Sequence, residues 1–342
     1  MRVLIAPDCF TGTMTAPEAA EAIAAGWLRS DPGAVLDLAP LSDGGPGFVE
    51  VLHRSTGGRL VTAQVTGPLG DAVPASFLVS DDGTAYLEAA AACGLALVPV
   101  GARRPVEAST AGVADLLTAA LDEGARRVVV GVGGTASTDG GRGCFDRLGG
   151  AGSLPADVEL LVATDVDNPL LGGNGAAIVY GPQKGADRSQ VALLEERMAA
   201  WAALSAGNAE APGAGAGGGL GYGLMLLGGR RVSGVQTVLD AVHLEERAAA
   251  VDLLLTGEGS FDGTSLQGKV PRGVAWVAQR TARPCVVLAG RVLVGRREFA
   301  AAGIDAAYSV EEVAGSLEAA RAEPAARLAD LAERVARSWT PC

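Results

Sequence analysis

Short apolar runs alternate with helical patterns at both ends of the chain. The run Val3-Leu4-Ile5 ends at Pro7 and Asp8, and a helical pattern follows from Pro17 to about Ser30. Proline suits the first turn of a helix. The same alternation returns from Val251 in "VDLLLTGEG", "PCVVLAG" and "AAYSV", and it ends in a long helical pattern. These patterns predict one parallel sheet to which both ends of the chain contribute strands.

The middle of the chain has a different texture. The segments "LVTAQVTG", "AVPASFLVS" and "TAYLEAA" are short and separated by turn residues, which indicates an antiparallel meander from Arg59 to Glu88. A helix is predicted from about Ala108 to Glu123, then a buried strand in "RRVVVGVGG" and a helix from about Arg188 to Leu204. The run "APGAGAGGGLGYG" is either a linker or a tight turn that opens a helix.

These segments predict an α/β protein with two domains. We expect a flavodoxin-like α/β domain with a parallel sheet from residues 1–60 and 237–342, and an inserted α/β domain with a mixed sheet from residues 61–236. A chain of 342 residues is long enough for two domains of ordinary size.

Charge and composition exclude several classes of protein. The net charge is −12 and no basic stripe is present, which argues against a nucleic-acid partner. No run approaches the roughly 20 apolar residues of a membrane span, and the N-terminal apolar run is too short for a signal peptide. Five scattered cysteines and two histidines indicate neither a disulfide framework nor a zinc site. We expect a soluble cytoplasmic monomer or homodimer that acts on a small molecule.

Glycine-rich loops with a carboxylate or a lysine follow the predicted strands. They read "PDCFTGT", "LSDGGPG", "GVGGTASTDGG", "ATDVDNPLLGGNG" with "GPQKG", and "TGEGSFDGTSLQGK". One such loop is usually only a turn, but five favour a ligand site. Glycine allows backbone N–H groups to converge on an anion, aspartate binds Mg²⁺ and lysine neutralises phosphate. The set is typical of phosphoryl transfer.

Two nucleotide motifs compete with this interpretation. "GVGGTA", from Gly131 to Ala136, fits a dinucleotide fingerprint, but the glycines that follow are poor material for the start of a helix. "GTSLQGKV", from Gly263 to Val270, fits a P-loop except for the final Ser or Thr that would hold Mg²⁺. Neither motif is favoured, although Lys269 before a helix remains a good phosphate contact.

The ordered set of loops resembles the bacterial glycerate kinase family with two α/β domains. The resemblance rests on "IAPD", "DGG", "GVGG", "NPLLG" with "NGAA", "YGPQKGA", "PGAGAGGGLG" and "TGEG" followed by "GK", and it runs from Met1 to about Ala320. It implies an enzyme that uses ATP and Mg²⁺ to phosphorylate D-glycerate in a cleft between two domains, mostly at the 2-hydroxyl.

The resemblance also implies site residues. We expect catalytic roles for Asp139, Lys269 and Asp43; substrate or phosphate binding by Asp8, Thr11, Gly44, Gly45, Gly134, Gly140, Gln183, Lys184 and Ser260; and metal binding by Glu258 and Asp262. Asp139 is either a base or orienting group for the acceptor hydroxyl or a turn-capping aspartate. Asp8 and Asp43 are candidates for the metal or the glycerate hydroxyls, or else helix caps. Asp165 and Asn168 are expected to organise their loop.

The chain departs from the family pattern at four polar positions. Thr11 replaces a lysine, Ser260 an arginine, Gln267 a histidine and Pro46 a glutamate. Two fewer cations predict a high KM for glycerate or a less anionic substrate, such as another small hydroxy acid or a polyol. A dehydrogenase that uses "GVGGTA" and a non-catalytic descendant that binds a metabolite are the alternatives from other classes.

Overall fold

The computed structural model describes residues 1–340, so Cys342 lies outside the described residues. The chain packs as two compact units, unit 1 from residues 1–42 and 235–342 and unit 2 from residues 43–234. The return to unit 1 falls within a few residues of the expected position. The first division comes well before residue 60, because helix α2 (Phe48–Thr56) packs on the meander of unit 2, where Phe48 meets the Tyr86 ring edge-on.

Unit 1 is built on a five-stranded parallel sheet in the order β13-β11-β9-β1-β2. Its strands are β1 (Arg2–Ile5), β2 (Val35–Leu38), β9 (Leu253–Thr256), β11 (Cys285–Ala289) and β13 (Ala306–Ser309). Numbered along the chain within this unit, the order is 2-1-3-4-5, which is that of flavodoxin-like folds. The expected parallel sheet from both chain ends is confirmed, since β1 pairs with β2 on one side and with β9 on the other.

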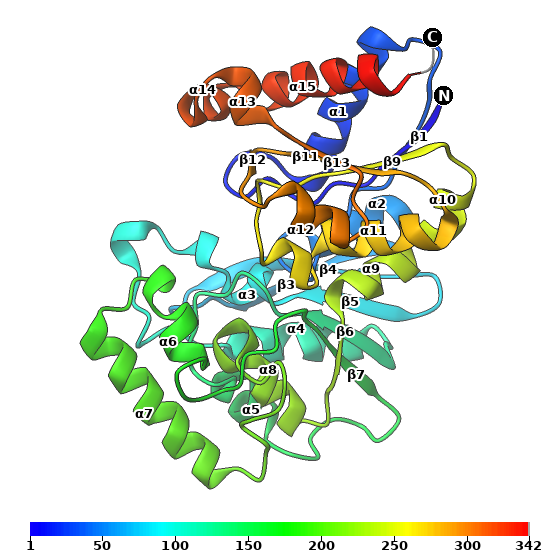
Figure 1. Ribbon diagram of the computed structural model, residues 1–342. Coiled ribbons are helices and arrows are strands. Elements are labelled where there is room, and N and C mark those ends of the chain that lie inside the picture. Colours follow the sequence, from blue (N-terminus) through cyan, green and yellow to red (C-terminus); the bar gives the residue numbers. More distant parts are fainter. Residues whose placement is uncertain (341–342) are drawn as a thin grey trace. The chain divides into compact units, whose positions relative to one another are not determined.

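Helices cover both faces of this sheet (Figure 1). On one face lie α1 (Ala16–Ser30), α13 (Val310–Ala314), α14 (Leu317–Ala322) and α15 (Pro324–Trp339), and on the other α10 (Leu244–Ala249), α11 (Val270–Thr281) and α12 (Arg296–Ala301). Thr15 and Glu18 form a capping box at the start of α1. Gly26 lets α1 approach α15 closely, since a Cβ there would lie 2.0 Å from the Ala329 carbonyl oxygen.

Unit 2 contains a six-stranded mixed sheet in the order β3-β4-β5-β6-β7-β8. The strands are β3 (Arg59–Thr66), β4 (Ala72–Val79), β5 (Thr84–Glu88), β6 (Arg127–Gly131), β7 (Glu159–Ala163) and β8 (Arg230–Val232). β3, β4 and β5 form the predicted antiparallel meander, and β5 to β8 run parallel.

The two faces of this sheet follow the alternation of side chains along each strand. In β5, Ala85 and Leu87 belong to a core with α4 (Ala111–Asp122), α5 (Arg142–Leu148) and α8 (Ala216–Leu226). Tyr86 points to the opposite face, where α2 lies. A smaller core joins α6 (Ala176–Tyr180) and α7 (Arg188–Leu204) around Trp201. Unit 2 also contains α3 (Ala89–Cys93), and α9 (Gly234–Ala241) begins at the return of the chain to unit 1.

The glycine run at residues 212–223 is a turn that opens a helix and not a linker. Gly217, Gly218 and Gly219 have φ values of 61°, 71° and 88° within the first turn of α8. A Cβ on Gly218 would lie 2.0 Å from the Ser137 carbonyl oxygen. Only glycine allows both this backbone and this approach. No helix within residues 1–340 is both long and apolar enough to cross a membrane.

Candidate active site

In unit 1, the loops after β1 and β9 meet where the strand order reverses. The backbone N–H of Asp8 donates to the Gly257 carbonyl oxygen at 2.8 Å, which joins the two loops directly beyond the strands. Open α/β sheets bind ligands outside the carboxyl ends of the strands at such a point. The structure therefore brings Asp8 and Thr11 next to the segment that carries Glu258 and Ser260.

The contact between these loops is close. A Cβ on Gly257 would lie 2.0 Å from the Leu288 carbonyl oxygen, and one on Gly259 would lie 3.3 Å from the Thr11 backbone nitrogen. Asp8 is 8 % exposed, and its Oδ1 accepts a hydrogen bond from the Cys9 backbone N–H at 2.7 Å. Thr11 is exposed. Gly259 thus lets the loops after β1 and β9 lie side by side, and Gly257 lets the loop after β9 pass close to β11.

The carboxylates expected to bind metal differ in their surroundings. Glu258 is 5 % exposed. Asp262 accepts hydrogen bonds at Oδ1 from the Thr264 hydroxyl at 2.6 Å and the Thr264 N–H at 2.8 Å. The Thr264 hydroxyl is the main cause that lowers the pKa of Asp262. Among residues 1–340, no group of three His, Cys, Asp or Glu side chains is placed to hold a metal ion.

Lys269 stands at the start of α11, where the loop after β9 ends. It is the N-cap residue of this twelve-residue helix, and Pro271 occupies the first turn. No side chain of the described residues caps the helix, and its first turn has no acidic residue. The N-terminus of a helix favours anions. A lysine at this position, at the carboxyl edge of the sheet, fits a phosphate or carboxylate group.

In unit 2, the loop that carries Asp43, Gly44 and Gly45 packs on the loop after β6. The N–H of Gly133 donates to the Gly44 carbonyl oxygen at 3.2 Å, and a Cβ on Gly133 would lie 2.7 Å from the Gly45 Cα. The Oδ1 of Asp43 accepts from the Gly45 N–H at 3.1 Å. A Cβ on Gly134 would lie 2.6 Å from the ring of Pro46. Two of the predicted loops therefore form one structure.

Asp139 connects the starts of two helices. Its Oδ2 accepts hydrogen bonds from the Thr110 N–H and hydroxyl, both at 2.9 Å, and from the Gly143 N–H at 3.2 Å. Its Oδ1 accepts from the Gly141 N–H at 3.1 Å. Burial raises the pKa of Asp139, although these donors favour its charged form. Of the two roles left open above, the contacts favour the capping aspartate.

Lys184 is buried at 4 % exposure, and its ammonium group holds the loop after β6. Nζ donates to the Thr135 hydroxyl at 3.2 Å and to the Ser137 carbonyl oxygen. A Cβ on Gly218 would lie 2.6 Å from Nζ, so the glycine turn of α8 makes room for it. Burial lowers the pKa of Lys184 to about 8. This lysine positions the loop that contains Gly134 and Gly140.

Three further predicted polar residues lie on the surface loops of unit 2. Gln183 is exposed, and its carbonyl oxygen accepts from Arg103 Nη1 at 3.1 Å. Asp165 accepts from the Ser233 hydroxyl at 2.6 Å. Asn168 donates to the Asn174 carbonyl oxygen at 2.8 Å and accepts from the Tyr180 hydroxyl at 2.7 Å. Asp165 and Asn168 therefore organise loops, as expected.

The sequence patterns did not point to Glu88, which ends β5 and meets the start of α2. The Gly47 N–H donates to its Oε2 at 3.0 Å. Burial raises the pKa of Glu88, and hydrogen bonds from the first turn of α2 oppose this. The carboxylate already occupies the position that an anionic ligand would take at this helix. The available signal was a glutamate at the end of a predicted strand.

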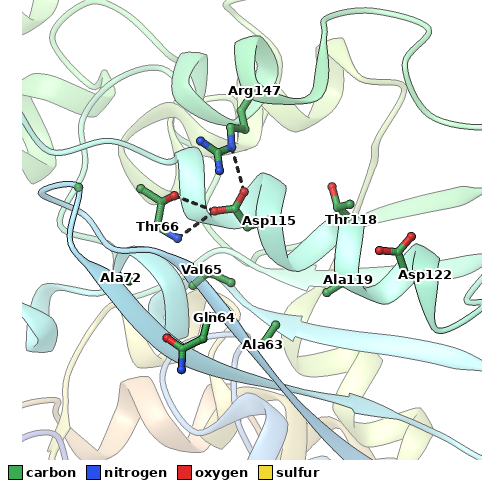
Figure 2. A pocket seen from close by; sticks show the side chains of 11 residues that line it. Ala63, Gln64, Val65, Thr66, Ala72, Asp115, Thr118, Ala119, Asp122 and Arg147 are labelled. Carbon is green, nitrogen blue, oxygen red and sulfur yellow. Dashed lines mark hydrogen bonds and ion pairs between the residues drawn. The ribbon is translucent and has the colours of Figure 1, made fainter.

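A hollow of about 560 Å³ in unit 2 shares no residue with the predicted site. Asp115 of α4 lies at its wall, where it accepts from the Thr66 N–H and hydroxyl and pairs with Arg147 at 2.9 Å (Figure 2). These contacts satisfy the polar groups that Figure 2 joins by dashed lines, so the hollow gives no support for a reaction site.

The fold and the loops define a two-unit α/β kinase of the type with a flavodoxin-like sheet. The chain belongs to the glycerate kinase family: the family's sequence model matches residues 3–154 and 150–340. The dehydrogenase alternative finds no support, because the loop after Gly131 opens into α5 only at Arg142.

Relatives match over nearly their full length. Glycerate 2-kinase of Escherichia coli K12 is 39% identical, with 94% of this chain and 93% of the relative covered. An uncharacterized protein of Mycobacterium tuberculosis is 48% identical over 98% of this chain and 91% of its own. A crystal structure assigned to glycerate kinase 2 of Salmonella typhimurium LT2 superposes with a TM-score of 0.79 at 34% identity, covering 99% of this chain and 98% of that one.

Proposed function

We propose that this kinase transfers the γ-phosphoryl group of ATP to D-glycerate, with 2-phosphoglycerate as the product. The names of the relatives support glycerate as the acceptor. The observation that carries the proposal from the structure is the placement of Lys269 at the N-terminus of α11, directly beyond the switch point of unit 1. There the ammonium group of Lys269 and the backbone N–H groups at the start of α11 favour the same anion.

The residues of unit 1 are assigned to the phosphates. Lys269 and the first turn of α11 bind phosphate oxygens. Phosphoryl transfer depends mainly on position and on neutralisation of charge, so this contact contributes directly to the rate. Asp8 and Thr11, on the neighbouring loop, orient the bound substrate through a carboxylate and a hydroxyl.

Glu258 and Asp262 are proposed to hold Mg²⁺. Mg²⁺ is usually bound by one or two carboxylates together with substrate phosphates and water, so two carboxylates on one loop fit it. When bound, the ion neutralises phosphate oxygens. Thr264 already donates to Oδ1 of Asp262, which fixes the orientation of the carboxylate that would hold the ion.

In unit 2 we propose Asp43 as the acceptor for the hydrogen of the reacting hydroxyl. Asp43 is half-buried, and its Oδ1 accepts a hydrogen bond from the Gly45 N–H. Asp139 and Lys184, by contrast, are proposed as positioning residues. Lys184 donates to the loop after β6, and Asp139 accepts hydrogen bonds at the starts of α4 and α5. The polar atoms of both side chains are therefore engaged with the protein, which favours Asp43 for the contact with substrate.

The test is ADP formation by the purified enzyme with a panel of acceptors. D-lactate carries only the 2-hydroxyl, 3-hydroxypropionate carries only the 3-hydroxyl, and glycerol lacks the carboxylate. We expect turnover with D-glycerate and a 2-phosphoglycerate signal by phosphorus NMR. A lack of ATP consumption with D-glycerate, in the presence of Mg²⁺, would refute the proposal, and a 3-phosphoglycerate product would refute its choice of hydroxyl.

A further inference from the structure

A short strand pair continues unit 1 beyond the carboxyl edge of its sheet. β10 (Ser260–Phe261) follows β9, and β12 (Arg291–Val292) follows β11. The two pair in parallel with Ser260 opposite Arg291, and the Arg291 N–H donates to the Gly259 carbonyl oxygen at 3.1 Å. β12 thereby places Arg291 beside the loop that carries Glu258 and Ser260.

The register decides which way the arginine faces. Residues directly opposite each other in a strand pair have their side chains on the same face. Ser260 is exposed, and the side chain of Arg291 is 39 % exposed. A guanidinium at position 291 therefore stands on the face that a side chain at position 260 occupies. That position is one of the two at which the sequence lacks an expected cation.

Glu311 holds Arg291 from one side. The arginine Nε donates to the Glu311 Oε2 at 2.9 Å, and the Glu311 backbone N–H donates to the Gly290 carbonyl oxygen at 3.0 Å. The pair uses only the Nε of the guanidinium; within residues 1–340, Nη1 and Nη2 have no hydrogen-bond partner. Arginine presents such nitrogens in a planar fork that suits carboxylate and phosphate oxygens.

The loops at this edge of unit 1 carry more carboxylates than cations. The loops after β1 and β9 carry the carboxylates Asp8, Glu258 and Asp262, against the single lysine Lys269. The net charge of −12 supplies no general attraction for an anion. A bound triphosphate or carboxylate therefore depends on local positive groups.

We propose that Arg291 is a substrate-binding residue whose guanidinium contacts a carboxylate or phosphate oxygen of the anionic substrates. It takes over, from the neighbouring strand, the charge that Ser260 does not supply. Glu311 fixes its orientation. This inference rests on the proposed kinase activity, and it removes the expectation that the missing arginine raises the KM for glycerate.

The experiment moves the cation between the two strands. Steady-state kinetics are measured for wild type, Arg291→Ser, and the double variant Ser260→Arg with Arg291→Ser, with D-glycerate and ATP varied separately. Arg280→Ser is the matched control, because Arg280 forms an equivalent Nε pair with Glu245 at 3.0 Å at the far end of α11. Circular dichroism and thermal melting establish that each variant is folded, and Arg291→Lys replaces Arg291→Ser if the serine variant is not.

We expect Arg291→Ser to lower kcat/KM by about 10- to 100-fold, Arg280→Ser to stay within about twofold, and the double variant to regain most of the loss. A rise in the KM for glycerate identifies a carboxylate contact, and a rise in the KM for ATP identifies a phosphate contact. A merely structural Arg291 would not be rescued from position 260. If wild type is active, two results would each refute the inference. One is that Arg291→Ser, or Arg291→Lys where it replaces the serine variant, has the kcat/KM and both KM values of wild type. The other is that the double variant is no more active than Arg291→Ser. An inactive wild type would instead refute the proposed function.

Discussion

Replacement of Lys184 by methionine tests the electrostatics of the loop after β6. Methionine keeps a similar length and removes the charge, together with the hydrogen bonds from Nζ to Thr135 and Ser137. Their loss adds an offset to the free energy of unfolding that does not depend on pH. The pH-dependent part of the difference between wild type and variant then reports the titration of the amine alone.

The sign and size of this pH dependence follow from the pKa of Lys184. The folded protein has a Lys184 pKa of about 8, against an ordinary value of 10.5. Between these values the unfolded chain binds more protons, so the free energy of unfolding of wild type rises with pH. The amine destabilises the folded state most below pH 8. Relative to pH 7, the titration of Lys184 raises the free energy of unfolding by about 1.4 kcal/mol at pH 9 and by about 2.5 kcal/mol at pH 10.

The assay is urea denaturation of wild type and Lys184→Met at pH 7, 8, 9 and 10. Arg103→Met is the control, because Arg103 contacts the neighbouring Gln183 carbonyl oxygen and arginine does not titrate in this range. We expect the stability of wild type relative to Lys184→Met to grow with pH, and relative to Arg103→Met to stay level. A level difference for Lys184→Met would show that burial does not depress the pKa of this amine.

Three further variants test other features. Lys269→Ala should lower kcat/KM by about one to two decades in the ADP assay with no change in melting temperature, because the proposed role of its ammonium is to bind substrate phosphate; normal kinetics would remove it from the site. Asp139→Asn should lower the free energy of unfolding in urea by about 1–3 kcal/mol, since an amide cannot accept all the hydrogen bonds at that site; unchanged stability would contradict the capping role. Ala282→Gly should raise the melting temperature, because Ala282 has a φ of 53° at the end of α11, a conformation that costs about 1–2 kcal/mol in residues with a Cβ; a lower melting temperature would contradict this.

The strand pattern of unit 1 could be predicted because local signals set it. Short buried runs such as Val3-Leu4-Ile5 are typical of central strands, and parallel strands need crossover connections that are usually helical. The meander of unit 2 was equally clear from its turn residues. The assignment of α2 was not, since its helical pattern is the same in either unit. Contact of Phe48 with Tyr86, a long-range packing detail, decides it.

The candidate site divides in the same way. The glycines of the loops could be predicted as turn positions from residue type alone, because glycine allows backbone conformations that other residues avoid. The carboxylates beside them could be predicted as polar groups of the same loops. The partners of those residues could not. Asp139 and Lys184 look alike as polar residues in glycine loops, yet their contacts with Thr110 and Ser137 come from segments many residues away. The pairing of Ser260 with Arg291 likewise depends on register and not on local sequence.

The pairing of β1 with β9 has a consequence for the synthesis of the protein. Residues 43–234 form one continuous stretch, so unit 2 can fold while the ribosome is still translating the rest. β1 and β2 leave the ribosome first, but β1 cannot complete its hydrogen bonds until β9 is made, and Thr256 lies 250 residues beyond Ala6 in the chain. At about 5–20 residues per second, this leaves apolar strands of the nascent chain without their partners for about 10–50 s. Chaperones that bind exposed apolar segments would meet the nascent chain at β1. A chain that ended before β9 would contain unit 2 together with a β1 strand that lacks its β9 partner.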